Sequence, residues 1–120
     1  MKFFRTLVIA HATYIMITAV WPIMDIDSFI LVTGPKTDIW LVKTVGALLI
    51  PVSLSMYSYF RTTTVDRPIL VLGIGTAIAF ISIDVYYSTS GTISDIYLLD
   101  AAVEFLFLVG WFILAFKKSK

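Results

Sequence analysis

The sequence has no cysteine and few charged residues. Of its 120 residues, 14% are charged and 59% are hydrophobic, and the mean hydropathy is +0.95. The absence of cysteine excludes disulfide scaffolds, thiol redox chemistry and thiolate metal sites. A soluble domain of this size needs far more polar surface than these few charges provide, so the chain is predicted to lie in a lipid bilayer.

The chain also lacks the positive charge of a nucleic-acid-binding protein. Its formal net charge is +1, and no basic face remains once the lysines and arginines are assigned to the ends of apolar segments. A single histidine without cysteine is a poor ligand set for a metal or haem group. We therefore expect neither a nucleic-acid partner nor a bound cofactor.

Four apolar segments are each long enough to cross the ~30 Å hydrocarbon core of a bilayer, which takes about 20 helical residues. They are Phe3–Met24, Ile39–Phe60, Pro68–Tyr87 and Ile96–Phe116. The connections between them are too short to fold independently. The predicted fold is all-α, a four-helix transmembrane bundle that forms a single integral membrane domain over residues 1–120.

The basic residues are distributed unevenly between the two sides of this bundle. Lys36 and Lys43 fall on one side, in or near the first connection. Seven others flank the chain ends or the second connection, namely Lys2, Arg5, Arg61, Arg67, Lys117, Lys118 and Lys120. By the positive-inside rule both termini are predicted to be cytoplasmic, in a multi-pass protein of the plasma (inner) membrane.

The two halves of the chain, residues 1–60 and 61–120, resemble each other without a gap. Positions 57 residues apart match in two blocks, Ile26–Phe29 with Ile83–Tyr86 and Thr33–Lys43 with Ser90–Asp100. The pattern predicts two tandem helical hairpins of the same orientation, a parallel repeat with a pseudo-twofold axis along the membrane normal.

Each hairpin would then have the same outer connection. Asp27 and Asp84 would end the outgoing helices, and Gly34 and Gly91 would supply the turns. The returning helices would be capped by Thr37-Asp38 and Ser94-Asp95. The first connection, Asp25–Asp38, is long and apolar, and we expect it to lie along the interface or to cover the bundle as a lid.

The repeat also predicts contacts between the halves. Lys43 aligns with Asp100, and equivalent positions of the second and fourth helices are expected to approach each other near a twofold axis. We therefore predict a Lys43–Asp100 salt bridge, which would neutralise two charges that are costly in lipid.

Ionisable side chains within membrane spans are rare, usually face the bundle interior and mark functional sites. Here the candidates are Lys43, Asp84, Asp100, Glu104 and His11, with Tyr14 on the same helix stripe as His11. Glu104 is the deepest carboxyl group, only about 3 Å from the bilayer midplane by helical rise. Two interpretations remain open: Glu104 serves the function, or it only stabilises the bundle through a hydrogen bond to a neighbouring helix.

His11 is a candidate partner of Glu104 if the first helix begins at Phe3. The repeat instead aligns His11 with Pro68, in the first turn of the third helix, and so places His11 near the cytoplasmic end. A His11–Glu104 proton relay and an isolated histidine are both compatible with the sequence.

The topology, together with a first connection marked by Gly34 and Pro35 and the helix opening Trp40-Leu41-Val42-Lys43-Thr44-Val45-Gly46, resembles the small DoxX-like bacterial membrane proteins. The resemblance implies a compact inner-membrane four-helix bundle, in a group sometimes linked to respiratory or redox systems. It carries no catalytic residue over to this chain.

Three functions are left open by the sequence. An outward-facing pocket formed by Lys43, Asp84, Asp100 and Glu104 would bind or transport a small amphiphile, a cation or a proton. Alternatively, His11 and Glu104 would perform acid–base chemistry on a lipid or isoprenoid-like substrate. In the third alternative the bundle is a homo-oligomer or an accessory subunit that packs against a larger membrane complex.

Overall fold

Five helices make up the chain in the computed structural model, which describes residues 2–62 and 64–119. They are α1 (Lys2–Met24), α2 (Ile26–Thr33), α3 (Ile39–Tyr57), α4 (Arg67–Thr89) and α5 (Tyr97–Ser119). No strand occurs within the described residues, so the predicted all-α class is confirmed. Each helix except α2 is long and apolar enough to cross a membrane, and these four agree with the predicted spans. The chain is a small multi-pass integral membrane protein.

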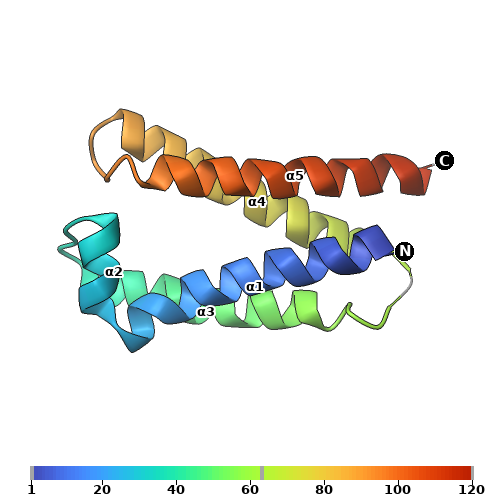
Figure 1. Cartoon of the computed structure of the whole chain (residues 1–120), viewed down its shortest axis with the longest axis horizontal. Coiled ribbons are helices and arrows are strands. Elements are labelled where there is room, and N and C mark those ends of the chain that lie inside the picture. The colour runs from blue at the N-terminus through green and yellow to red at the C-terminus, as the bar shows by residue number, and fades with distance from the viewer. Residues whose placement is uncertain (1, 63, 120) are drawn as a thin grey trace.

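The four long helices form two antiparallel hairpins (Figure 1). α1 packs along α3 and α4 packs along α5. Between the hairpins, α1 contacts α5 and α3 contacts α4, so a circuit around the bundle runs α1, α3, α4, α5. Both chain termini lie at one end of the bundle, here called the termini end, and α2 lies at the other, here called the α2 end.

This circuit places α3 and α5 on a diagonal of the bundle, and for that reason the predicted Lys43–Asp100 salt bridge is wrong. Lys43 is exposed, and the basic side chain that contacts a carboxyl group among the described residues is His11, beside Glu104. Asp100 accepts a hydrogen bond from Tyr14 instead. A twofold axis through such a bundle relates diagonal helices, so equivalent positions lie farther apart than positions on neighbouring helices.

Small residues determine which face of α3 meets α1. Gly46, Ser53 and Met56 are its buried residues. A Cβ atom at position 46 would lie 2.5 Å from the carbonyl oxygen of Ala19, so only glycine allows this close approach of two helices. The Ser53 hydroxyl donates to the carbonyl oxygen of Ala12 over 2.6 Å. Lys43 therefore lies on the exposed face of α3.

The helices pack most tightly at the termini end. Phe4, Met56, Ile69 and Trp111 come from four different helices, are fully buried and belong to one hydrophobic cluster. Gly73 of α4 lies against the Trp111 ring, because a Cβ atom there would be 2.2 Å from Cε2. All four long helices therefore close on one another at this end.

Large apolar side chains cover the outside of the bundle. Ile17, Leu48, Val71 and Leu106 lie on four different helices and are between 61% and 71% exposed. Such residues are costly in water, but they suit contact with acyl chains, where no polar surface is needed. The bundle surface is thus matched to a lipid environment.

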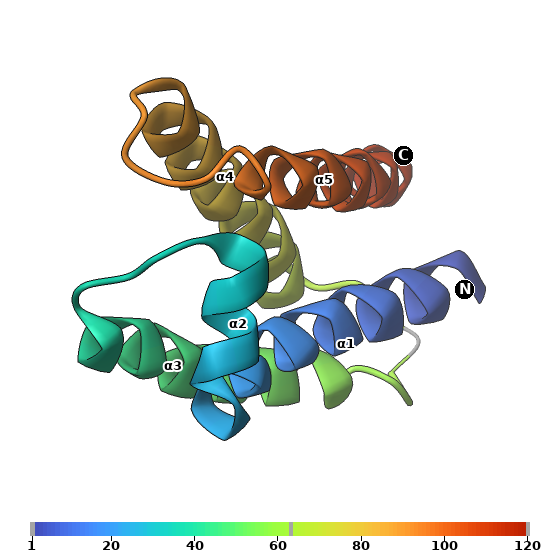
Figure 2. The same cartoon turned by 60° about the vertical axis from the view of Figure 1, so that its left-hand side comes forward.

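α2 crosses the bundle axis at the α2 end (Figure 2). Asp25 begins this helix by accepting a hydrogen bond from the backbone N–H of Ser28 at 3.3 Å. The Trp21 indole donates to Ser28 Oγ over 2.9 Å, and its ring packs edge to face against Phe29 with centroids 5.3 Å apart. The first outer connection is therefore a short helix that covers this end of the bundle.

The two outer connections differ, although the repeat predicts that they are alike. α4 continues to Thr89, so Asp84 lies inside it, whereas Asp27 lies in the first turn of α2. The prediction that both aspartates end outgoing helices is wrong, because the first connection forms a helix of its own. Gly34 and Gly91 do turn the chain, with φ of 101° and 80°. The duplication itself stays a prediction.

Candidate functional site

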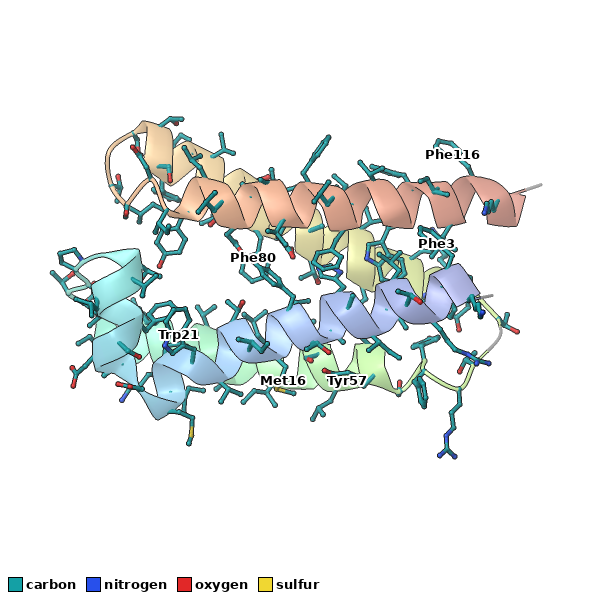
Figure 3. All side chains as sticks on the ribbon, in the orientation of Figure 1. Phe3, Met16, Trp21, Tyr57, Phe80 and Phe116 are labelled. Carbon is teal, nitrogen blue, oxygen red and sulfur yellow. The ribbon has the colours of Figure 1, made fainter. Side chains whose placement is uncertain are left out.

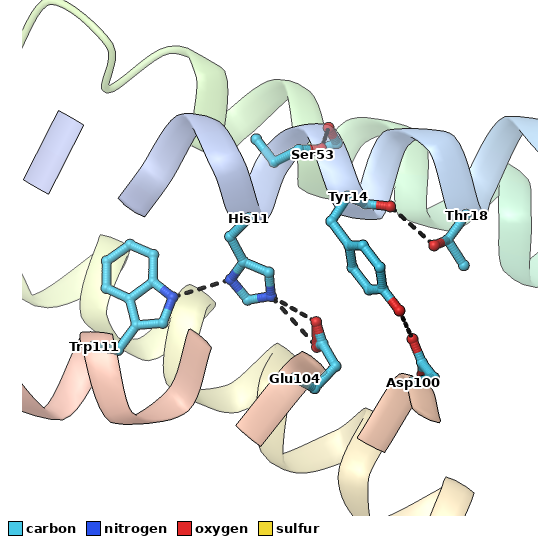
Figure 4. A network of polar contacts seen from close by, with 8 residues as sticks. His11, Tyr14, Thr18, Ser53, Asp100, Glu104 and Trp111 are labelled. Atoms are coloured by element: carbon cyan, nitrogen blue, oxygen red, sulfur yellow. Dashed lines mark hydrogen bonds and ion pairs between the residues drawn. The ribbon is translucent and has the colours of Figure 1, made fainter. Parts of the chain in front are cut away.

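A buried histidine–carboxylate pair joins the two hairpins near the middle of the bundle (Figure 4). His11 Nε2 of α1 lies 2.9 Å from Glu104 Oε1 and 3.3 Å from Oε2 of α5. Both side chains are fully buried. The sequence left the depth of His11 open, and in the structure it lies at the level of Glu104.

Trp111 determines which nitrogen of His11 carries the proton. The indole Nε1–H of Trp111 donates to His11 Nδ1 over 3.0 Å (Figure 4). An indole nitrogen can only donate, so Nδ1 must be unprotonated and the imidazole proton must lie on Nε2. His11 is therefore a neutral ring that donates to Glu104, and it supplies no positive charge to the bundle interior.

A second polar contact lies one helical turn closer to the α2 end. The Tyr14 hydroxyl of α1 donates to Asp100 Oδ1 of α5 (Figure 4). Phe107 lies between the two contacts, since its ring stacks on His11 at a centroid distance of 4.3 Å and packs against Tyr14 at 5.8 Å. Two polar contacts, one helical turn apart, therefore join α1 to α5, and the Phe107 ring packs beside both of them.

Asp84 of α4 is buried near these contacts, but its hydrogen bonding is incomplete among the described residues. Its side chain is 3% exposed, and Oδ2 is the buried side-chain polar atom without a hydrogen-bond partner among the described residues. Asp100 of the neighbouring helix α5 lines the same cavity as Asp84. A buried oxygen without a partner loses its hydration and gains nothing in return, which costs about 1–3 kcal/mol.

Two cavities meet at Asp84 in the half of the bundle nearer α2. One, of about 240 Å³, includes Tyr14 and Asp100 in its wall and lies on the α1–α5 side. The other, of about 300 Å³, includes Val45 and Ile83 and lies on the α3–α4 side. Five residues line both cavities: Thr18, Phe29, Phe80, Asp84 and Tyr97.

The cavity walls are mainly apolar and aromatic. In Figure 3 Trp21 and Phe80 extend into the space between the two hairpins, and both line the smaller cavity. Phe29 of α2 closes both cavities at the α2 end. An apolar wall with a few convergent polar groups is the usual construction of a small-molecule site.

Lys36 lies at the rim of the larger cavity. Its ammonium group donates to the carbonyl oxygens of Thr33 at 3.2 Å and Gly34 at 3.0 Å, and to Thr33 Oγ1 at 3.1 Å. It also lies 5.7 Å from the Phe29 ring centroid and 5.0 Å from that of Tyr97. Lys36 thus connects the end of α2 to the start of α5.

The structure brings together most of the residues that the sequence singled out. Tyr14, Asp84 and Asp100 line the cavities, and His11 and Glu104 form the buried pair just below them. Lys43 does not belong to this group, because it is exposed on α3. No group of three or more His, Cys, Asp or Glu side chains within residues 2–62 and 64–119 is arranged to hold a metal ion.

Sequence reasoning missed the aromatic walls of the cavities. Phe29 and Phe80 occur in apolar runs where any large residue is expected, and nothing in their spacing distinguishes a cavity wall from a packed core. The one usable pattern is Phe29 and Thr33, four residues apart, which marks the buried face of α2.

Comparisons of the chain with protein-family models, with curated proteins and with solved structures find no match. Function therefore has to be inferred from the geometry of the site, and the resemblance to DoxX-like proteins stays a prediction.

Proposed function

We propose that this integral membrane protein binds a small amphiphilic molecule between its two hairpins, in the half of the bundle nearer α2. The observation that carries the proposal is Asp84 Oδ2, which has no hydrogen-bond partner within residues 2–62 and 64–119 and is buried where two cavities meet. A polar ligand head that donates to this oxygen would remove the cost of leaving it without a hydrogen bond. The aromatic walls would hold the apolar remainder of the ligand.

The position of the cavities supports entry from the bilayer. They lie along the two seams between the hairpins, at α1–α5 and at α3–α4. The helices contact each other less across these seams than within each hairpin. In a membrane these seams face acyl chains, whereas α2 covers the end of the bundle. If the termini are cytoplasmic, as the basic residues predict, the site opens in the outer leaflet of the plasma (inner) membrane.

The buried His11–Glu104 pair does not favour an enzymatic function over binding. Neither side chain lines either of these two cavities, and both are fully buried, so a ligand in the two cavities touches neither group. An acid or base has to reach the proton that it transfers, directly or through one water molecule. The pair instead supports a structural function, holding α1 against α5 below the cavities.

Calorimetric titration of octan-1-ol into the protein in lipid nanodiscs tests this proposal. We expect saturable binding to the native chain and a loss of affinity of about tenfold or more in Thr18→Phe, because Thr18 lines both cavities and the larger ring would fill them.

Ile17→Phe is the matched control, since Ile17 is 61% exposed on the adjacent position of the same helix. It adds the same ring to the lipid-facing surface and should bind octan-1-ol like the native chain. The proposal is overturned if the native chain shows no saturable binding, or if Thr18→Phe binds as well as Ile17→Phe.

A further inference from the structure

We infer that the ligand head is a cation, namely the ammonium group of a lipophilic amine. This inference rests on the proposed function and specifies the chemistry of that same site. It follows from the juxtaposition of two carboxyl groups, Asp84 and Asp100, in one aromatic-walled cavity, with no lysine or arginine paired to either of them among the described residues.

The first step is the charge around the cavities. Asp84 and Asp100 line the smaller cavity, and Glu104 lies one turn of α5 below Asp100. No lysine or arginine in the described part of the chain forms an ion pair with any of these carboxyl groups. Lys43 is exposed, Lys36 is bound to three oxygens of the α2 terminus, and His11 is held neutral by Trp111.

The second step is the orphaned oxygen. Asp84 Oδ2 has no partner in the described part of the chain, while the only other carboxyl group in the cavity wall already accepts a hydrogen bond from Tyr14. A carboxylate is an acceptor, and within a membrane it needs a cation or a donor. An ammonium head meets both needs, because it brings positive charge and N–H donors to the same atom. A carboxylate or phosphate head would place a further acidic group beside Asp84 and Asp100.

The third step is the character of the wall. Phe29 and Tyr97 line both cavities, and the Lys36 ammonium already lies over both rings, at 5.7 Å and 5.0 Å from their centroids. The chain itself therefore shows that these rings accept an ammonium group on their faces. The apolar wall selects an organic cation over a hydrated metal ion, which needs a shell of oxygen ligands.

The test compares three molecules with the same chain and different heads, titrated by calorimetry in the same nanodiscs. These are octylamine, which is protonated near pH 7, octan-1-ol, which is neutral, and octanoate, which is an anion. We expect octylammonium to bind about tenfold more tightly than octan-1-ol, and octanoate to bind more weakly than either.

Asp84→Asn should reduce the affinity for octylammonium by about tenfold and that for octan-1-ol by less than about threefold, because the amide oxygen still accepts a hydrogen bond from the hydroxyl head but supplies no charge. Retained binding of octan-1-ol shows that this variant is folded. Asp95→Asn is the matched control, because it removes an exposed carboxyl group of the α4–α5 connection and should leave all three affinities unchanged.

Two failures are distinguishable. If octan-1-ol binds in a manner that depends on Thr18 but octylammonium binds no more tightly, or if Asp84→Asn weakens both molecules equally, the inference is overturned and the proposed site stands. If none of the three molecules binds saturably to the native chain, the proposed function itself is overturned.

Discussion

The same four helices pack differently in the two halves of the bundle. In the half nearer the termini, Phe4, Ile69 and Trp111 from three helices fill the space between the hairpins and are fully buried. In the half nearer α2, the hairpins are separated by two cavities that meet at Asp84. The half nearer the termini, here called the closed half, is therefore a packed core. The half nearer α2, here called the open half, contains the candidate site.

Residue size at the contact positions explains this difference. Gly73 lets the Trp111 ring lie directly against α4, and Gly110 lets Leu7 approach α5, where a Cβ atom would be 2.9 Å from Leu7 Cδ1. Near α2 the corresponding position of α4 is occupied by Phe80, whose ring stands between the hairpins (Figure 3). A small residue closes a bundle around a large partner, whereas a large residue without a small partner holds it open.

The largest change in the free energy of unfolding is expected from a methyl group added to the tightly packed closed half. In Gly73→Ala the new methyl group would overlap the buried Trp111 ring, so we expect the free energy of unfolding to fall by about 3 kcal/mol. Gly75→Ala is the matched control, because its Cβ atom would meet nothing within 4 Å and alanine favours a helix by about 1 kcal/mol over glycine. Unfolding in mixed micelles, followed by circular dichroism, measures both. Equal stability of the two variants would contradict the close contact between Gly73 and Trp111.

The next effect concerns the boundary between the halves. Glu104→Leu leaves the His11 Nε2–H buried without an acceptor, so we expect a loss of about 2 kcal/mol in the free energy of unfolding. Glu104→Gln keeps an oxygen acceptor and should cost less than half as much. The same unfolding measurement tests both variants, and a greater loss in the glutamine variant would show that His11 does not donate to Glu104.

The proton position on His11 can be observed directly. The chain has one histidine, so the ¹⁵N spectrum of selectively labelled protein should show a single neutral ring with its proton on Nε2. Trp111→Phe removes the donor to Nδ1 and should produce a mixture of tautomers. An imidazolium spectrum near pH 7 in the native chain would overturn the neutral assignment.

A smaller effect of opposite sign is expected in the open half. Asp84→Leu replaces a buried carboxyl group whose Oδ2 has no partner within the described residues, so we expect the free energy of unfolding to rise by about 1 kcal/mol. The same variant should no longer prefer octylammonium over octan-1-ol. A marked loss of stability would instead show that the folded bundle satisfies this carboxyl group.

The smallest effect is expected at the surface of the closed half, outside the membrane spans. The Tyr59 hydroxyl donates to Asp66 at 2.9 Å and 3.1 Å, and this hydrogen bond raises the pKa of Tyr59 above its ordinary value. Because the folded state favours the protonated phenol, the contribution is complete below pH about 10 and is lost as the pH rises above it. The stability difference between the native chain and Tyr59→Phe should therefore shrink in alkaline solution.

The long helices could be predicted because their signal is local. A run of apolar residues of about 20 positions has no other stable environment than a bilayer, so the four spans follow from composition alone. The burial of Glu104 followed from the same principle, since a carboxyl group in the middle of a span has to face other helices.

The errors came from interactions that depend on three dimensions. Lys43 was expected inside because of its charge, but the face of α3 that meets α1 is chosen by the close contact of Gly46 with Ala19. The contact of His11 with Glu104 was one of two open interpretations, and only the register of α1 against α5 decides between them. The Trp111–His11 hydrogen bond joins residues 100 positions apart, and no pattern along the chain indicates it.

The sparse contact between the hairpins has a consequence for assembly. Each hairpin is held mainly by its own packing, α1 on α3 and α4 on α5, and each begins and finishes at the termini end of the bundle. Divided between α3 and α4, the chain would give two polypeptides able to insert separately. Their reunion would depend on the few side chains that cross the seam, with His11 and Glu104 among them. In the intact protein, the connection between α3 and α4 keeps the two hairpins close together, so they do not have to meet by diffusion in the plane of the membrane.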